Sequence, residues 1–102
     1  MRTPRLAYYL AERYVPSMSP VEIDRAIGRL DEGAADERVR HVLSILVHGE
    51  DTCLSIFEAL DPRAIERVTD RAGFRLDRIV EVTAYPGGRA RSRSTASTER
   101  SG

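Results

Sequence analysis

Residues 38–59, RVRHVLSILVHGEDTCLSIFEA, decide the fold, because they contain two strand-like runs joined by a short turn. The run Arg38–Val47 alternates cleanly between two faces, as expected of a strand. Residues 48–51, HGED, carry turn-forming types, and the run Thr52–Ala59 leads back. Two such runs around a short polar turn predict a β-hairpin.

Strand and helix signals lie on both sides of this hairpin. Leu6–Val15 contains three tyrosines and a valine, residues that favour strands, and Pro16 ends it. Ser19-Pro20-Val21-Glu22 is a capping box with proline at the first helical position, and apolar residues then recur at helical spacing. We therefore predict a helix from about Pro20 to Ala35.

After the hairpin the same alternation of signals returns. Asp61 before Pro62 is an N-cap signal, and Gly73 is placed to end a second helix. Asp77–Tyr85 contains a strand-forming run with Ile79, Val80 and Val82.

The predicted order is β-α-β-β-α-β, which is the ferredoxin-like α+β arrangement. Right-handed crossovers then give an antiparallel four-stranded sheet of order 4-1-3-2 with two helices on one face. The opposite face of the sheet is left uncovered by its own chain.

The hairpin turn fixes which residues lie opposite one another. Centring the turn between Gly49 and Glu50 places Val47 opposite Thr52, Ile45 opposite Leu54, Leu43 opposite Ile56 and His41 opposite Glu58. This aliphatic face is expected to pack against the helices. The other face pairs Leu46 with Cys53, Ser44 with Ser55 and Val42 with Phe57, and it is expected to stay open.

A small, partly apolar open face is typical of a surface covered by a partner. We therefore expect a C2 homodimer that encloses a cleft between two sheets. The alternative is a monomer with an open, weakly hydrophobic sheet.

Candidate ligand-binding residues are those expected to face this cleft. They are Tyr8, Glu12, Cys53, Ser55 and Glu81. Carboxylates in a cleft can act as general bases or bind a cation, or they can pair with Arg13 or Arg78 at the rim. The sequence does not decide which face of the first strand packs against the helices, because both of its faces carry core-forming side chains.

The residue types allow two further arrangements. Cys53 with His48 and Asp51 has the residue types of a nucleophilic site, although a buried cysteine also serves as a small apolar residue. His41 opposite Glu58 is either a titrating pair or a polar cross-strand pair. No histidine or cysteine spacing matches a zinc site, and no phosphate-binding glycine loop is present.

Length and composition bound the remaining possibilities. The chain of 102 residues is expected to form one domain, residues 1–85, followed by a disordered tail rich in Arg, Ser and Gly, residues 86–102. Sixteen basic residues, all arginine, balance sixteen acidic ones, so nucleic acid is an unlikely partner except weakly through the tail. The apolar runs are too short to span a membrane, and the single cysteine excludes an internal disulfide. We expect a cytoplasmic protein.

Three runs also suggest a relationship. Residues 7–16, AYYLAERYVP, residues 50–59, EDTCLSIFEA, and residues 71–82, RAGFRLDRIVEV, resemble a widespread bacterial family of domains of unknown function, typified by small actinobacterial nickel-binding proteins. The resemblance covers residues 6–83 and implies a ferredoxin-like fold and a dimer.

The residues that bind metal in that family are largely missing here. Thr69 stands where the resemblance implies a histidine in the second helix, and Glu12-Arg13 stands where it implies a histidine in the first strand. Only Cys53 is retained. We therefore predict no metal site and no cofactor, with nickel as the alternative.

Three functions follow from these observations. The first is a small dimeric protein that binds a small ligand between its sheets. The second is a nickel-binding or other metal-binding protein, through Glu12, Cys53 and Glu81. The third is a cofactor-free enzyme of the dimeric α+β barrel type, which rests on analogy of fold alone.

Overall fold

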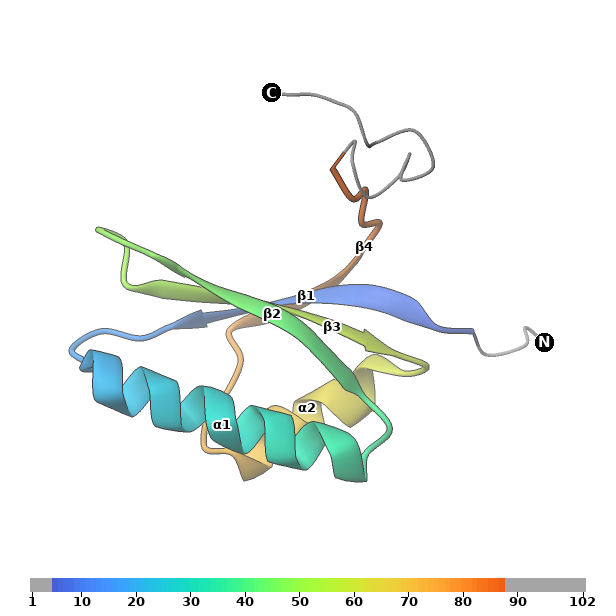
Figure 1. Cartoon of the computed structure of the whole chain (residues 1–102), viewed down its shortest axis with the longest axis horizontal. Coiled ribbons are helices and arrows are strands. Elements are labelled where there is room, and N and C mark those ends of the chain that lie inside the picture. Colours follow the sequence, from blue (N-terminus) through green and yellow to red (C-terminus); the bar gives the residue numbers. More distant parts are fainter. Residues whose placement is uncertain (1–4, 88–102) are drawn as a thin grey trace, which may run out of the picture.

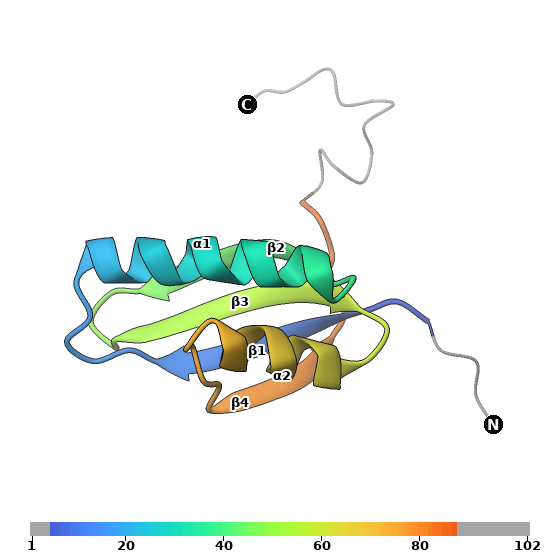
Figure 2. The same ribbon diagram turned by 90° about the horizontal axis from the view of Figure 1, so that it is seen from below.

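Six elements follow one another in the computed structural model, which describes residues 5–87, and their order confirms the predicted β-α-β-β-α-β pattern. The sheet order is β2-β3-β1-β4 with antiparallel neighbours, and both helices cover the same face of the sheet (Figures 1 and 2). The elements are β1 (Ala7–Tyr14), α1 (Pro20–Asp36), β2 (Arg40–Val47), β3 (Thr52–Ala59), α2 (Pro62–Arg71) and β4 (Arg78–Val82). The ferredoxin-like fold is therefore as predicted.

Of the tail predicted over residues 86–102, only Pro86 and Gly87 belong to the described residues, and 88–102 lie outside them. Within residues 5–87, neither helix combines the length and the apolar character that crossing a bilayer requires.

Both helices begin where their capping residues predict. The Ser19 hydroxyl accepts a hydrogen bond from the amide of Glu22 at 3.2 Å, and the Glu22 carboxylate accepts one from the amide of Ser19 at 2.8 Å. Asp61 accepts a hydrogen bond from the amide of Arg63 at 2.9 Å and so caps α2. Gly73, with a φ of +74°, ends α2 in the left-handed region that glycine adopts without strain.

The hairpin has the predicted register near its turn and a different one at its far end. Val47 lies opposite Thr52 and Leu43 opposite Ile56, as predicted. A β-bulge between His41 and Leu43 then shifts the pairing, so that His41 lies opposite Phe57. The predicted pairing of His41 with Glu58 is therefore wrong, and Arg40 takes that place, with its Nε 2.9 Å from a Glu58 oxygen.

The bulge also reverses, from Leu43 onward, which side chains of β2 face the helices. Val39 is buried, but Leu43 and Ile45, two of the residues expected beside it in the core, are 45% and 50% exposed. On β3, it is Cys53 and the residues of the same parity that are buried. The predicted core face is therefore wrong, because one extra residue in a strand moves every later side chain to the other face.

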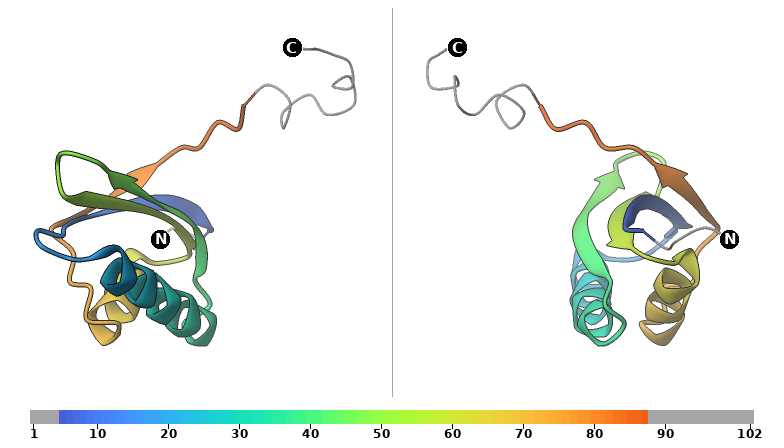
Figure 3. Two further views of the ribbon diagram at one scale, coloured as in Figure 1. Left: turned by 60° about the vertical axis from the view of Figure 1, so that its left-hand side comes forward. Right: turned by 90° about the vertical axis from the view of Figure 1, so that its right-hand side faces the viewer.

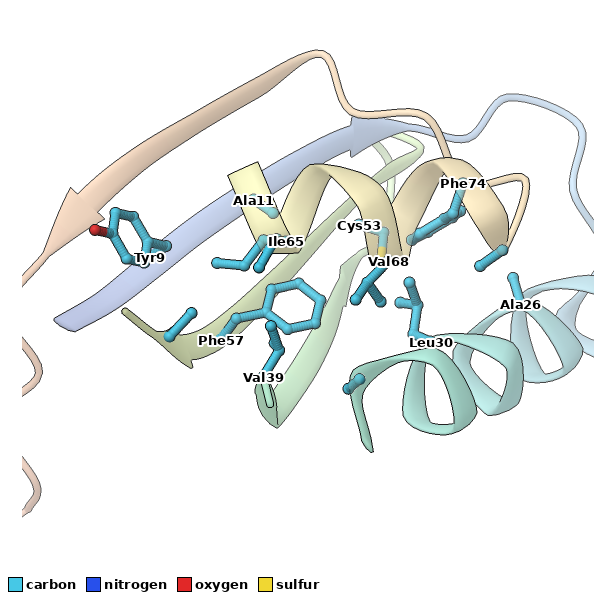
Figure 4. Packing of buried hydrophobic residues seen from close by; sticks show 14 of the residues in the cluster. Tyr9, Ala11, Ala26, Leu30, Val39, Cys53, Phe57, Ile65, Val68 and Phe74 are labelled. Atoms are coloured by element: carbon cyan, nitrogen blue, oxygen red, sulfur yellow. The ribbon is translucent and has the colours of Figure 1, made fainter. Parts of the chain in front are cut away.

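The core lies between the helices and the sheet face that carries Cys53 and Phe57 (Figure 4). Large core side chains come from both layers: Leu30, Ile65, Val68 and Phe74 from the helices and the segment after α2, and Tyr9 and Phe57 from β1 and β3. The fully or nearly fully buried hydrophobic residues include Ala11, Leu30, Cys53, Phe57, Ala59, Ile65, Val68 and Phe74. The remaining buried positions of these strands are small, Ala11, Cys53, Ser55 and Ala59, and Leu30, Ile65 and Val68 pack from the helix side.

A candidate ligand site on the open sheet face

An aliphatic stripe crosses the uncovered face of the sheet from edge to edge. Leu43 on β2 lies opposite Ile56 on β3, Ile56 lies opposite Leu10 on β1, and Leu10 lies opposite Val80 on β4. Residues paired across strands share a face, and these four face away from the helices. The open face is therefore more apolar than the sequence predicts, because Leu43, Ile45 and Ile56 lie on it and not in the core.

A trough of about 550 Å³ lies on this face. Its volume falls within the range of small-molecule sites. It is lined mainly by apolar side chains from the four strands and by the segment that follows β4; these residues are Tyr8, Leu10, Val42, Leu43, Ile56, Val82, Thr83, Ala84, Tyr85 and Pro86. The bulge contributes to it directly, because Val42 and Leu43 both line the trough and are both exposed.

One corner of the trough is lined by Tyr8, whose hydroxyl lies beside Arg40 and Glu58 just outside the lining. Arg40 donates a hydrogen bond to the Tyr8 hydroxyl at 3.4 Å and forms its ion pair with Glu58. The hydrogen bond to Glu58 raises the pKa of Arg40 above its usual value, so the guanidinium stays charged and is balanced by the carboxylate. The trough therefore offers an apolar wall and a hydrogen-bonding corner with no net charge.

The five predicted site residues do not come together. Tyr8 lines the trough, and Glu12 lies on the open face, where its carboxylate is 3.9 Å from Arg78. Cys53 and Ser55, 1% and 2% exposed, lie under the helices. Glu81 is paired with the buried Tyr9, so it has the helix-side parity, and its carboxylate is 3.7 Å from Arg5. The prediction that Cys53, Ser55 and Glu81 face the open side is wrong.

Cys53 has the surroundings of a structural cysteine. Burial raises the pKa of its thiol, while hydrogen bonds with the hydroxyls of Ser55 and Ser44 act in the opposite direction more weakly. A nucleophilic cysteine needs a lowered pKa and access to solvent. The predicted arrangement with His48 and Asp51 is not what the structure shows around this thiol.

A hydrogen-bonded chain that the sequence analysis missed runs between α1 and the hairpin. His41 Nδ1 lies 2.6 Å from an Asp31 oxygen, His41 Nε2 lies 2.8 Å from the Ser44 hydroxyl, and that hydroxyl lies 2.6 Å from the hydroxyl of Ser55. The His41 ring also packs against Phe57 at 5.1 Å between centroids. No sequence spacing indicates this chain, because the bulge after His41 is what turns Ser44 toward the helices and His41.

The chain has the order carboxylate, imidazole, hydroxyl, but its position favours a structural role. The His41 side chain is only 8% exposed, and the Ser44 hydroxyl is shared with the buried Ser55. Buried hydroxyls are costly unless they are hydrogen-bonded. We therefore interpret the chain as a polar connection that fixes α1 on the hairpin and holds the bulge that shapes the trough.

A second hollow, of about 300 Å³, lies between α2 and β4 and is mostly charged. Its lining includes Asp70, Asp77 and Arg75, and Asp77 already accepts a hydrogen bond from the amide of Tyr14 at 2.6 Å. Across residues 5–87, no three His, Cys, Asp or Glu side chains are grouped so that they could hold a metal ion. The apolar trough is therefore the stronger candidate site.

Comparison with known proteins identifies the fold. No family model matches the chain, and no curated protein is detectably similar to it. The crystal structure of SCO4226 from Streptomyces coelicolor A3(2) superposes with a TM-score of 0.71 at 21% sequence identity, covering 78% of this chain and 100% of that one. This likeness supports the ferredoxin-like fold described above.

Proposed function

We propose that two copies of this chain pack their open sheet faces together and that the dimer binds a small, largely apolar ligand in the cleft between them. The observation that carries the proposal is the continuous aliphatic stripe on a face that no helix covers, with the 550 Å³ trough beside it. Exposed apolar patches of this extent are typical of interaction or ligand surfaces.

The area of the open face suits a dimer. Three strands of eight residues and one of five, about 4.8 Å apart with a rise of about 3.3 Å per residue, present roughly 460 Å² of sheet plane, and side chains raise the accessible area above that. A stable interface buries about 800 Å² per partner. A second copy offers the matching apolar surface, because a C2 interface joins the same patch on both subunits.

The lining of the trough favours one class of ligand. Its walls provide aliphatic contacts from residues such as Leu10 and Ile56, and the Tyr8 hydroxyl can hydrogen-bond one polar group. The Arg40–Glu58 pair adds no net charge. We therefore propose a neutral molecule with an apolar body and a single hydrogen-bonding group.

Titration with Nile red, a neutral apolar dye, tests ligand binding. Val82→Trp fills the trough, and Val21→Trp, at a site on α1 that is 58% exposed, is the matched control. We expect saturable binding to the wild type and the control, and binding weakened about tenfold or more by Val82→Trp while the dimer persists in sedimentation. Equal binding to all three proteins, or binding to none, contradicts the proposal.

Nickel binding, cofactor-free catalysis and a cytoplasmic location stay predictions of the sequence. The trio offered for metal, Glu12, Cys53 and Glu81, is divided between the two faces of the sheet. The described contacts add no observation in favour of the other functions.

A further inference from the structure

The segment Thr83–Pro86, here called the arm, follows β4 and leaves the sheet on the side away from the helices (Figures 1 and 3). It forms one wall of the trough. Tyr85 within it is 78% exposed, more than any other large hydrophobic side chain in residues 5–87. An aromatic ring is therefore held out in water beside the most apolar surface of the molecule.

We propose that the arm of each copy packs against the open face of its partner, so that Tyr85 completes the partner's half of the ligand cleft. This inference rests on the proposed dimer. It goes beyond that dimer because it makes the cleft a composite site, in which each half is incomplete without a residue from the other chain.

The geometry of stacked sheets supports this assignment. Two sheets that pack face to face lie about 10 Å apart. An arm that projects from one sheet toward the second must occupy the space between them or contact the second sheet. The arm's contacts within residues 5–87 leave Tyr85 78% exposed, so the ring is available for packing against a partner.

The chemistry of Tyr85 suits this position. Tyrosine buries a large rigid ring while keeping a hydroxyl for a hydrogen bond, and it is enriched at protein interfaces for that reason. In the partner's trough it would meet aliphatic side chains such as Leu43 and Ile56. The dyad supplies two such contacts for each dimer.

The first test compares the dissociation constants of Tyr85→Ala and Val21→Ala dimers by sedimentation equilibrium. Losing an aromatic anchor raises the dissociation constant of an interface about tenfold or more. In a two-fold symmetric dimer the anchor is lost from both copies, so the two losses multiply. We expect about 100-fold weaker dimerisation for Tyr85→Ala and no change for the α1 control, since Val21 lies on the helix side. A change of less than about threefold for Tyr85→Ala contradicts the proposal.

The second test measures how far dimerisation protects cysteine thiols, introduced at the same two sites, from labelling. The native Cys53 is buried and so gives only a low background. The rate at which a maleimide labels Tyr85→Cys should fall as the protein concentration rises through the dissociation constant, while the labelling of Val21→Cys stays constant. A dimer whose Tyr85→Cys thiol reacts as fast as in the monomer overturns the inference and leaves the dimer standing. A wild-type protein that stays monomeric overturns both.

Discussion

Replacing His41 with alanine tests the hydrogen-bonded chain beneath α1. The change removes the hydrogen bonds to Asp31 and Ser44, each about 1 kcal/mol, and the ring contact with Phe57, again about 1 kcal/mol. We therefore expect the free energy of unfolding to fall by about 3 kcal/mol. For a domain of this size, that lowers Tm by roughly 12–24 °C.

Two further variants separate the contributions. His41→Phe keeps a ring against Phe57 and loses both hydrogen bonds, so we expect a loss of about 2 kcal/mol. The other histidine of the chain, His48, is exposed in the turn, and His48→Ala should stay within about 0.5 kcal/mol of wild type.

The assay is urea unfolding followed by circular dichroism, with all proteins at one concentration because dimerisation contributes to apparent stability. If the free energy of unfolding of His41→Ala lies within about 1 kcal/mol of the wild-type value, the hydrogen-bonded chain through His41 does not have the stabilising role described above.

Three further predictions concern the backbone, the core and an ion pair. Gly28→Ala should stabilise the protein by about 0.5–1 kcal/mol in thermal unfolding, because its added Cβ meets nothing within 4 Å in a helix, whereas Gly73→Ala should destabilise it by about 1 kcal/mol, because φ there is +74°. Cys53 should resist Ellman's reagent in the folded protein and react fully in urea, and fast labelling of the native protein would contradict its burial. Hydrogen bonds from Arg71, aided by a neighbouring arginine, hold the pKa of Glu37 below its usual 4.5, so the carboxylate contributes stability that is present above pH 4.5 and is lost as pH falls through the lower folded-state value. Glu37→Gln should therefore be less stable than wild type at pH 7, and a difference that persisted at pH 2 would argue against this assignment.

The sequence predicts the element order well because the start and end signals are local. The Ser19–Glu22 capping box and Asp61 act through hydrogen bonds to residues two or three positions away. The topology then follows from general rules of handedness and connection. None of these signals requires knowledge of what packs against what.

The faces of the sheet are not predictable in the same way. Alternation in residues 38–47 indicates that two faces exist, but a bulge at Val42 exchanges them halfway along the strand. Val39 and His41 face the helices, as predicted. Ser44, which was expected on the open face, also turns toward the helices and contacts the buried Ser55. Because the candidate site was inferred from that parity, the prediction placed Cys53 and Ser55 in the cleft, whereas the structure buries them in the core.

The sequence does contain one indication of which face of β3 is buried. The β3 run places Cys53, Ser55, Phe57 and Ala59 on one face, which has no charged residue, whereas the other face carries Glu58. Weighing the two faces of β3 by charge would have favoured burial of the face that carries Cys53. The polar chain through His41 has no comparable signal, since Asp31 and Ser44 meet only after the bulge forms.

Sedimentation equilibrium of the wild type and two variants at micromolar concentration tests whether two copies meet through the open sheet face. Ile45→Glu places a charge on the open face at a side chain that is 50% exposed, and Val21→Glu places the same charge on the exposed surface of α1. We predict that wild type and Val21→Glu sediment at twice the chain mass of 11.4 kDa, and that Ile45→Glu sediments as a folded monomer. A wild-type protein of 11.4 kDa, or an Ile45→Glu protein that is as dimeric as wild type, would show that the bare sheet face is not where two copies meet.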